Sequence, residues 1–360
     1  MEPLVASVHS PIPRGDAGRL GAARRSARYE RDLAHPSRDR ESFELESTLR
    51  AHALRDGAHV DVHLMARLHP NPPAMPPWLR MAELRAWCIA AAMLCASPAH
   101  AQVRVTLPSL DQVAGRPVAL IGFWFGAATA SPAPAVVLLH GCGGTYNRQG
   151  ALSERSLEYA RLLNDHGMHA LVLDSLTPRG EKQLCTQRIG TRAVTQANRR
   201  LDALAAVDWL AQRADVDARR IGLMGWSNGG STVLAALNTR HADVAQAAVT
   251  PAFAVAFYPG CEADLKRGFE TGTKLLMLVG EADDWTAAAP CHELARMAQG
   301  TAPEIEGYAG AYHGFDSVAK LRLREDVPNG VNPGRGVHVG GDAAAFVASR
   351  ERLLRFLAQQ

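Results

Sequence analysis

Ser227 has the setting of an activated nucleophile. It is the centre of the pentapeptide Gly225-Trp-Ser-Asn-Gly229, which follows an apolar run at residues 221–224 and opens a stretch of small residues. A serine on a tight turn between a strand and a helix forms a nucleophile elbow, where glycine on each side lets the backbone pass without a Cβ clash. The helix N-terminus also favours negative charge that develops near the hydroxyl. These residues predict nucleophilic chemistry at Ser227.

A serine hydroxyl is a poor nucleophile without an adjacent base. Chains with this elbow carry an acid and then a histidine after the serine. His313 fits that order, because it lies in Tyr312-His-Gly-Phe315, on a loop that follows an apparent strand at 305–309. His292 is the alternative, but it lies in a predicted helix beside Cys291. We predict His313 as the base.

The acid is expected just after the strand that precedes His313 in the chain. The strand predicted at 274–280 is followed by Glu281, Asp283 and Asp284. Asp283 is the predicted acid, Asp284 is the nearby alternative, and Glu281 is a third candidate. An acid in this position holds the imidazole in one tautomer and stabilises the imidazolium.

An oxyanion hole in this type of site uses two backbone N–H groups. One belongs to the residue after the nucleophile, here Asn228. The other comes from a loop after an early strand, and His140-Gly-Cys-Gly-Gly144 is that loop. Cys142 is the predicted second donor, with Gly143 as the alternative. Cys142 is not predicted as a nucleophile, because no elbow surrounds it.

Alternating strands and helices must bring these groups together. Continuous apolar runs predict buried strands at 135–140, 170–174 and 220–225, and further strands are predicted at 118–126, 252–258 and 274–280. Helical spacing of apolar residues predicts helices at 154–166, 198–212, 228–237 and 342–358. In the last helix Asp342 is the predicted N-cap, and the side chains expected to face inward are Phe346, Val347, Leu353, Leu354 and Phe356.

This alternation predicts an α/β domain over residues 102–360, with a mostly parallel central sheet and helices on both faces. The net charge of +3 is too small to indicate nucleic acid or an acidic membrane surface as a partner. The predicted partner is a small-molecule ester, and the chemistry needs no metal or organic cofactor.

The first 101 residues differ in character from the rest. Residues 1–74 are rich in Arg, His, Pro and Asp and are predicted to be a non-native upstream stretch or a disordered extension. Residues 75–101 have a basic start, an apolar run of about 11 residues and an Ala-His-Ala end, as in a cleaved signal peptide. The run is too short to span a bilayer, so no stable membrane insertion is expected after cleavage. We predict a periplasmic or secreted protein that starts near Gln102.

Four cysteines remain after this segment: Cys142, Cys185, Cys261 and Cys291. In an exported protein they can form two disulfides, and four cysteines allow three pairings. We favour Cys142–Cys185 with Cys261–Cys291. Four free buried thiols are the alternative.

The sequence resembles the dienelactone hydrolase family of the α/β-hydrolase superfamily. The segments that carry the resemblance span nearly the whole predicted domain and are Leu138-Leu-His-Gly-Cys-Gly-Gly144, Leu173-Asp-Ser-Leu-Thr-Pro-Arg-Gly180, Gly222-Leu-Met-Gly-Trp-Ser-Asn-Gly-Gly230, Val279-Gly-Glu-Ala-Asp-Asp-Trp-Thr286 and Tyr312-His-Gly-Phe315. The resemblance implies the α/β-hydrolase fold and a nucleophile–histidine–aspartate triad of Ser227, His313 and Asp283.

The sequence departs from the family pattern at two positions. Family members that cleave dienelactones use cysteine where this chain has Ser227, and they place an arginine for the substrate carboxylate where it has Ser317. Arg179 is a candidate anion-binding residue in their place, with a structural loop arginine as the alternative reading. Trp226 and Trp285 are further candidate substrate-binding residues.

The predicted function is an exported serine hydrolase that cleaves carboxylic esters through an acyl-enzyme. The alternatives are a prolyl-oligopeptidase-type peptidase and an esterase for dienelactone, polyester or feruloyl substrates. Prolyl oligopeptidases usually carry a large N-terminal domain, whereas residues 1–74 have a composition typical of disorder. A non-enzymatic binding module is disfavoured, because a candidate for each triad position is present.

Overall fold

The computed structural model describes residues 5–8, 43–55, 58–67, 102–129 and 132–360, and the chain divides into two compact units, Met1–Cys95 and Ala96–Gln360. In the first unit, β1 (Val5–Val8), β3 (Ala58–Arg67) and β2 (Phe43–Arg55) pair in that order as an antiparallel sheet. That residues 1–74 are a non-native upstream stretch or a disordered extension stays a prediction. The predicted signal peptide at 75–101 lies outside the described residues.

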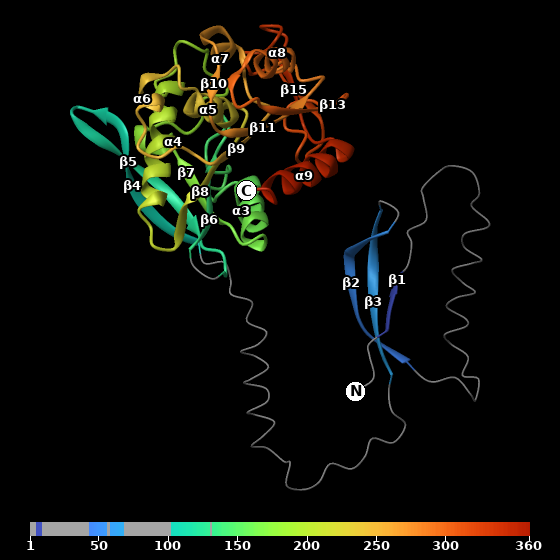
Figure 1. Ribbon diagram of the computed structural model, residues 1–360. Coiled ribbons are helices and arrows are strands. Elements are labelled where there is room, and N and C mark those ends of the chain that lie inside the picture. Colours follow the sequence, from blue (N-terminus) through green and yellow to red (C-terminus); the bar gives the residue numbers. More distant parts are fainter. Residues whose placement is uncertain (1–4, 9–42, 56–57, 68–101, 130–131) are drawn as a thin grey trace, which may run out of the picture. The chain divides into compact units, whose positions relative to one another are not determined.

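The second unit is built on a twisted sheet whose strands run in the order β13-β11-β9-β8-β6-β7-β5-β4 (Figure 1). From β13 to β7 all neighbouring strands are parallel, and β5 and β4 add an antiparallel edge. The strands are β4 (Gln102–Val113), β5 (Arg116–Phe125), β6 (Ala133–Leu139), β7 (His169–Asp174), β8 (Val216–Trp226), β9 (Phe253–Phe257), β11 (Lys274–Gly280) and β13 (Glu304–Tyr308). The prediction of a mostly parallel sheet is confirmed.

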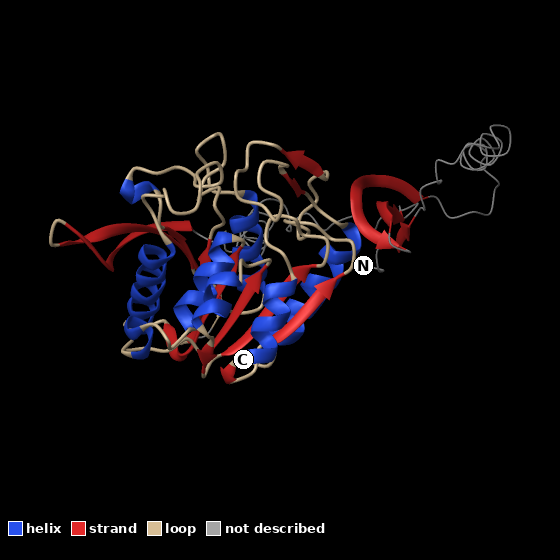
Figure 2. Ribbon diagram, turned by 90° about the horizontal axis from the view of Figure 1, so that it is seen from above, coloured by secondary structure: helices blue, strands red, loops and turns tan. Residues whose placement is uncertain are grey.

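Two hydrophobic clusters cover the two faces of this sheet. Successive residues of β6 alternate between them, with Val137 and Leu139 in one cluster and Val136 and Leu138 in the other. The first cluster includes residues of α4 (Gln196–Ala211), α5 (Asn228–Leu237) and α8 (Ala289–Met297). The second includes residues of α3 (Glu154–Asp165) and α9 (Ala343–Leu357). Helices therefore lie on both faces, as predicted (Figure 2).

Shorter elements complete the unit. They are η2 (Thr177–Arg179), α6 (Ala242–Ala245), α7 (Glu262–Arg267), the parallel pair β10 (Glu270–Thr271) with β12 (Gln299–Gly300), and the antiparallel pair β14 (Arg322–Arg324) with β15 (Val337–Val339). Among the described residues, no helix has both the length and the apolar character needed to cross a membrane.

Two disulfides link distant segments of the second unit. Cys142 in the loop after β6 is bonded to Cys185, and Cys261 is bonded to Cys291 of α8. This is the pairing favoured from the sequence. The first bond ties the loop after β6 to the long connection between β7 and α4, and the second ties the loop after β9 to α8.

Candidate active site

The predicted site residues follow parallel strands and therefore meet at the end of the sheet where the carboxyl ends of those strands lie. Ser227 follows β8 in the middle of the sheet, Asp283 follows β11, and His313 follows β13. The carboxyl ends of parallel strands are the usual place for ligand sites in such sheets, because the connecting loops gather there.

The backbone at Ser227 has the strained geometry expected of a nucleophile elbow. Its φ is 54° and its ψ is −119°, a region that residues other than glycine rarely adopt. The turn is tight enough that a Cβ on Gly225 would lie 2.3 Å from the carbonyl oxygen of Gly229. The Ser227 N–H donates to the Phe257 carbonyl at 2.9 Å, which fixes the turn to the neighbouring strand.

The three predicted triad side chains form a continuous chain of hydrogen bonds. His313 Nε2 lies 2.8 Å from Ser227 Oγ, and His313 Nδ1 lies 2.7 Å from Asp283 Oδ2. All three residues are buried, with exposed fractions of 9% for Ser227, 5% for Asp283 and 4% for His313. With the Nδ1 proton donated to Asp283, Nε2 is free to accept the serine proton, as a general base must.

Backbone and hydroxyl donors hold the Asp283 carboxylate in place. The N–H groups of Trp285 and Thr286 donate to Asp283 Oδ1 at 2.8 and 2.9 Å. Thr286 Oγ1 donates to Asp283 Oδ2 at 3.0 Å and also lies 3.1 Å from His313 Nδ1. These contacts fix which carboxylate oxygen faces the imidazole, and Thr286 is a part of the site that the sequence reasoning missed.

The alternative acid and base residues are engaged elsewhere. Asp284 accepts from the His338 backbone N–H at 2.8 Å and lies 2.7 Å from the Nδ1 of the same residue. Glu281 pairs with His292 at 2.8 Å, and both side chains are partly exposed. Among the candidates, the structure brings Asp283 and His313 together with Ser227.

The loop after β6 passes directly beside the elbow. A Cβ on Gly141 would lie 3.3 Å from the Trp226 carbonyl oxygen and 3.6 Å from Ser227 Cβ. Cys142 follows, and its carbonyl accepts from the Leu184 N–H at 2.7 Å. Asn228 is the first residue of α5, so its N–H has no partner within the helix. Both predicted oxyanion donors thus belong to segments adjacent to Ser227.

A buried polar group lies behind these two segments. Arg199 of α4 is 1% exposed and donates to the Asn228 side-chain oxygen and, at 2.7 Å, to the His140 carbonyl. Burial lowers the pKa of Arg199 to about 10, which leaves it charged at neutral pH. Burial and the Arg199 charge lower the pKa of His140 to about 3, which leaves that imidazole neutral. The sequence reasoning missed Arg199, although it shares a helical stripe with Ala203, Ala206 and Leu210.

Arg179 is a structural loop residue rather than a free anion-binding group. Its guanidinium donates five hydrogen bonds, which go to Asp111, Asp202 and the Ser175 carbonyl. A guanidinium has five N–H donors, so none is left for a substrate anion. The structure therefore favours the alternative reading of Arg179.

The two candidate tryptophans differ in their surroundings. Trp226 is 3% exposed, stacks on Phe257 and donates its indole N–H to Asp316 Oδ2 at 2.9 Å, so its side chain belongs to the core and is closed to a substrate. Trp285 is half-buried, and its ring centroid lies 4.6 Å from that of His313. Of these two residues, the structure brings Trp285 to the triad.

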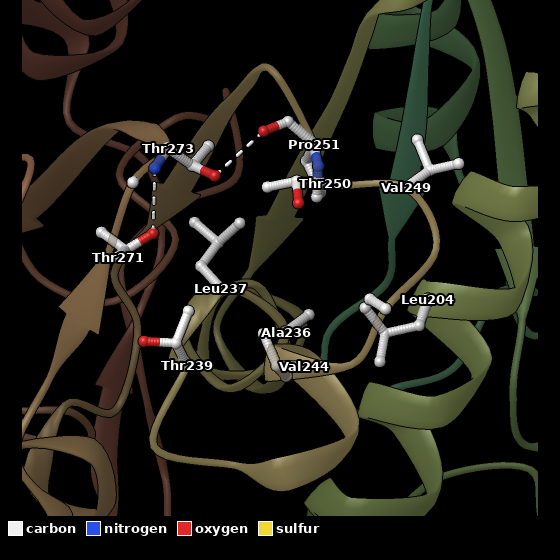
Figure 3. Close-up of a pocket in the computed structure, with 12 residues that line it drawn as sticks. Leu204, Ala236, Leu237, Thr239, Val244, Val249, Thr250, Pro251, Thr271 and Thr273 are labelled. Carbon is white, nitrogen blue, oxygen red and sulfur yellow. Dashed lines mark hydrogen bonds between the residues drawn. The ribbon is translucent and has the colours of Figure 1, made fainter.

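A cavity of about 30 Å³ lies at another place in the fold, between the C-terminal end of α5 and the loop before β9 (Figure 3). Leu204, Ala236, Leu237, Val249 and Thr273 are among its lining residues, none of which is titratable. Thr273 Oγ1 donates to the Pro251 carbonyl at 2.9 Å across this region. The cavity has room for about one or two water molecules, and it has no part in the site around Ser227.

The model of the dienelactone hydrolase family matches residues 120–359, which include every site residue described above. This chain belongs to the dienelactone hydrolase family. Where dienelactone-cleaving members have a cysteine nucleophile, this chain has Ser227, and where they have an arginine for the substrate carboxylate, it has Ser317. The Ser317 hydroxyl donates to the Gly314 carbonyl at 2.9 Å.

Solved structures of this family have the same fold. The dienelactone hydrolase-like promiscuous phosphotriesterase P91 from metagenomic libraries is 22% identical, with a TM-score of 0.50, over 72% of this chain and 98% of its own. A candidate dienelactone hydrolase from Klebsiella pneumoniae subsp. pneumoniae is 16% identical, with a TM-score of 0.51, over 72% of this chain and 100% of its own. The candidate hydrolase YtaP of Bacillus subtilis (strain 168) is 29% identical over 113 residues, and the match spans 28% of this chain and 38% of YtaP.

Proposed function

We propose that this protein is a serine hydrolase that cleaves carboxylic esters through an acyl-enzyme. Ser227 Oγ attacks the ester carbonyl carbon while His313 Nε2 takes the serine proton, and the carbonyl electron pair moves onto oxygen. The N–H groups of Cys142 and Asn228 stabilise that oxyanion. The observation that carries the proposal is the hydrogen-bonded chain from Ser227 through His313 to Asp283, at 2.8 and 2.7 Å.

The oxyanion then returns its electron pair to re-form the carbonyl, which completes the acylation half of the reaction. In the same step His313 gives its proton to the leaving alkoxide, and the carbon–oxygen bond to the alcohol breaks. A water molecule then attacks the acyl-enzyme, with its proton taken by His313, and the acid leaves as Ser227 regains its hydrogen. Asp283 stays ionised throughout and holds the imidazole.

The charge around the site supports a neutral ester rather than an anionic lactone as substrate. All donors of Arg179 are taken by protein acceptors, and position 317 is a serine whose hydroxyl is bonded to Gly314. Neither residue offers a free cation to a substrate carboxylate. Neutral esters are therefore the expected substrate class.

Covalent labelling and an ester panel test this function. A fluorophosphonate probe is expected to label the wild type and Ser231→Ala, whose serine lies one helical turn further on, but not Ser227→Ala. Ester hydrolysis should fall in Ser227→Ala by at least about 10³-fold. The panel varies the acyl chain and adds a dienelactone, a feruloyl ester, a phosphotriester and a prolyl-dipeptide amide. Labelling retained in Ser227→Ala, or activity confined to the amide, would overturn the proposal.

We also propose that residues 75–101 are a signal peptide and that the mature protein is exported. Two disulfides in the described chain support this, since disulfides persist mainly in oxidising compartments. Sequencing of the mature N-terminus in a secreting bacterial host is expected to start at Gln102. A mature chain that keeps Met1 would contradict the proposal.

A further inference from the structure

Arg199 joins the two segments that supply the proposed oxyanion donors. One of its terminal nitrogens donates to the His140 carbonyl at 2.7 Å, two residues before Cys142. The other donates to the side-chain oxygen of Asn228. The planar guanidinium fixes the angle between two such bonds, so the position of one segment depends on the other.

Packing alone does not explain a buried arginine at position 199, because burying its charge costs free energy. The side chain is fully buried, and in the described chain its hydrogen bonds go to a carbonyl and an amide oxygen rather than to a carboxylate. Its Nε has no hydrogen-bond partner there. The nearby carboxylates of Asp202 and Asp174 stabilise its charge without a direct bond: Asp202 is bonded by Arg179, and Asp174 accepts from the backbone after β7. A buried charge without a directly bonded counter-ion destabilises a fold, which argues that its charge serves the site.

Glycine contacts show how closely these segments meet. A Cβ on Gly229 would lie 2.0 Å from the Leu139 carbonyl oxygen and 2.6 Å from the His140 carbonyl oxygen. The start of α5 therefore packs directly on the end of β6, and Arg199 donates a hydrogen bond to each side of this junction. Burial and the Arg199 charge lower the pKa of His140 to about 3, so the imidazole beside this junction is neutral at pH 7.

We infer that Arg199 is a positioning residue for the oxyanion hole: it holds the Cys142 and Asn228 backbones in register and provides positive potential where the carbonyl oxygen becomes negative. This inference rests on the proposed acyl-enzyme function. Arg199 forms and breaks no bond in the reaction. Its effect grows as charge moves onto oxygen, so it acts on the transition state more than on substrate binding.

Four variants separate this role from a structural one. Arg199→Met removes the charge and both bonds, and Arg199→Lys keeps the charge but cannot bridge two acceptors in the same way. Asn228→Ala keeps the backbone N–H and removes the acceptor. Arg200→Met, the matched control, changes the next residue of α4, whose guanidinium pairs with Asp243.

We expect Arg199→Met to lower kcat by about 10²-fold, with KM changed by less than about threefold. Arg199→Lys and Asn228→Ala should each lower kcat by about tenfold. The control Arg200→Met should lower it by less than about threefold. In the double variant of Arg199→Met with Asn228→Ala, the losses should be clearly less than additive, because both remove the same bond. All rates are expressed per active site, titrated to completion with a fluorophosphonate.

A transition-state analogue gives the readout that a loss of stability would not change. A trifluoromethyl ketone forms a hemiketal oxyanion with the serine, so its affinity should fall in parallel with kcat across the Arg199 and Asn228 variants. Wild-type kcat and wild-type ketone affinity in Arg199→Met would overturn the inference. If Arg199→Met does not fold, wild-type kcat and wild-type ketone affinity in both Arg199→Lys and Asn228→Ala would overturn the inference. A wild type that cleaves no ester would instead overturn the proposed function.

Discussion

At the scale of single residues, the site distinguishes two adjacent carboxylates by their surroundings. Asp283 is bonded to His313 and to two backbone N–H groups, whereas Asp284 is bonded to the backbone and ring of His338. The two side chains have the same chemistry and the same charge. Their hydrogen-bond partners differ because each side chain leaves the loop after β11 in a different direction.

This difference predicts opposite outcomes for matched substitutions. Asp283→Asn should lower kcat by about 10³–10⁴-fold, because an amide there favours the wrong imidazole tautomer. Asp284→Asn should lower kcat by less than about tenfold, since it loosens only the contact with His338. Steady-state ester hydrolysis by both purified variants, with thermal melting as a check of folding, measures this. A larger loss in Asp284→Asn than in Asp283→Asn would assign the acid to residue 284.

The triad candidates could be predicted from sequence because their order and their places after strands follow from the fold. Arg199 was missed because a charged residue in a helix is usually solvated. Its partners, the His140 carbonyl and the Asn228 side chain, are 59 and 29 residues away in the chain. Arg179 could not be assigned for a similar reason, because Asp111, which helps to bind it, lies in a strand that the sequence did not indicate.

At the scale of elements, the buried strands and one edge strand, β13, were predictable, whereas the other edge strand, β4, was not. The runs that became β6, β7 and β11 are almost entirely buried and read as continuous apolar segments. β4 was missed because most of its residues are at least partly exposed, and its polar side chains hide the pattern. In α9, Asp342 caps the helix as predicted. Val347 was wrongly expected inside, since the buried stripe passes through Ala345 and Ser349 instead.

Asp316 connects several of these elements to the histidine loop. Its buried carboxylate accepts from Tyr159 of α3 at 2.9 Å, from Trp226 of β8 at 2.9 Å and from Tyr258 after β9 at 2.7 Å, and it pairs with Arg155 at 3.2 Å. Burial and the nearby carboxylate raise the pKa values of both tyrosines. The loop that carries His313 is thus attached to the elbow strand through one side chain.

We predict that Asp316→Asn lowers the free energy of unfolding by about 2–4 kcal/mol, because buried donors lose their acceptor. Arg155→Met, which removes one partly exposed donor and leaves the other bonds, should have a smaller effect. Urea unfolding of both variants at neutral pH measures the difference. Equal losses in the two variants would show that the Arg155 ion pair, and not the whole set of bonds, carries the stability.

At the scale of the whole second unit, two disulfides close loops of similar length but differ in what they hold. The paired cysteines are 43 residues apart for Cys142–Cys185 and 30 apart for Cys261–Cys291. Chain-entropy arguments give each bond about 4 kcal/mol of stabilisation. Cys142, however, is also a proposed oxyanion donor, and Leu184 beside its partner bonds the Cys142 carbonyl.

The two bonds should therefore separate stability from catalysis. The double variant Cys261→Ala with Cys291→Ala is expected to lose about 4 kcal/mol of unfolding free energy and to keep kcat within about threefold below its melting temperature. Cys142→Ala with Cys185→Ala should lose a similar amount and, in addition, about tenfold or more in kcat, because the Cys142 N–H is no longer held toward the serine. Urea unfolding and ester kinetics at one low temperature measure both. Equal kcat values in the two double variants would show that the loop after β6 keeps its place without its disulfide, and that Arg199 and the Leu184 bond suffice to hold it.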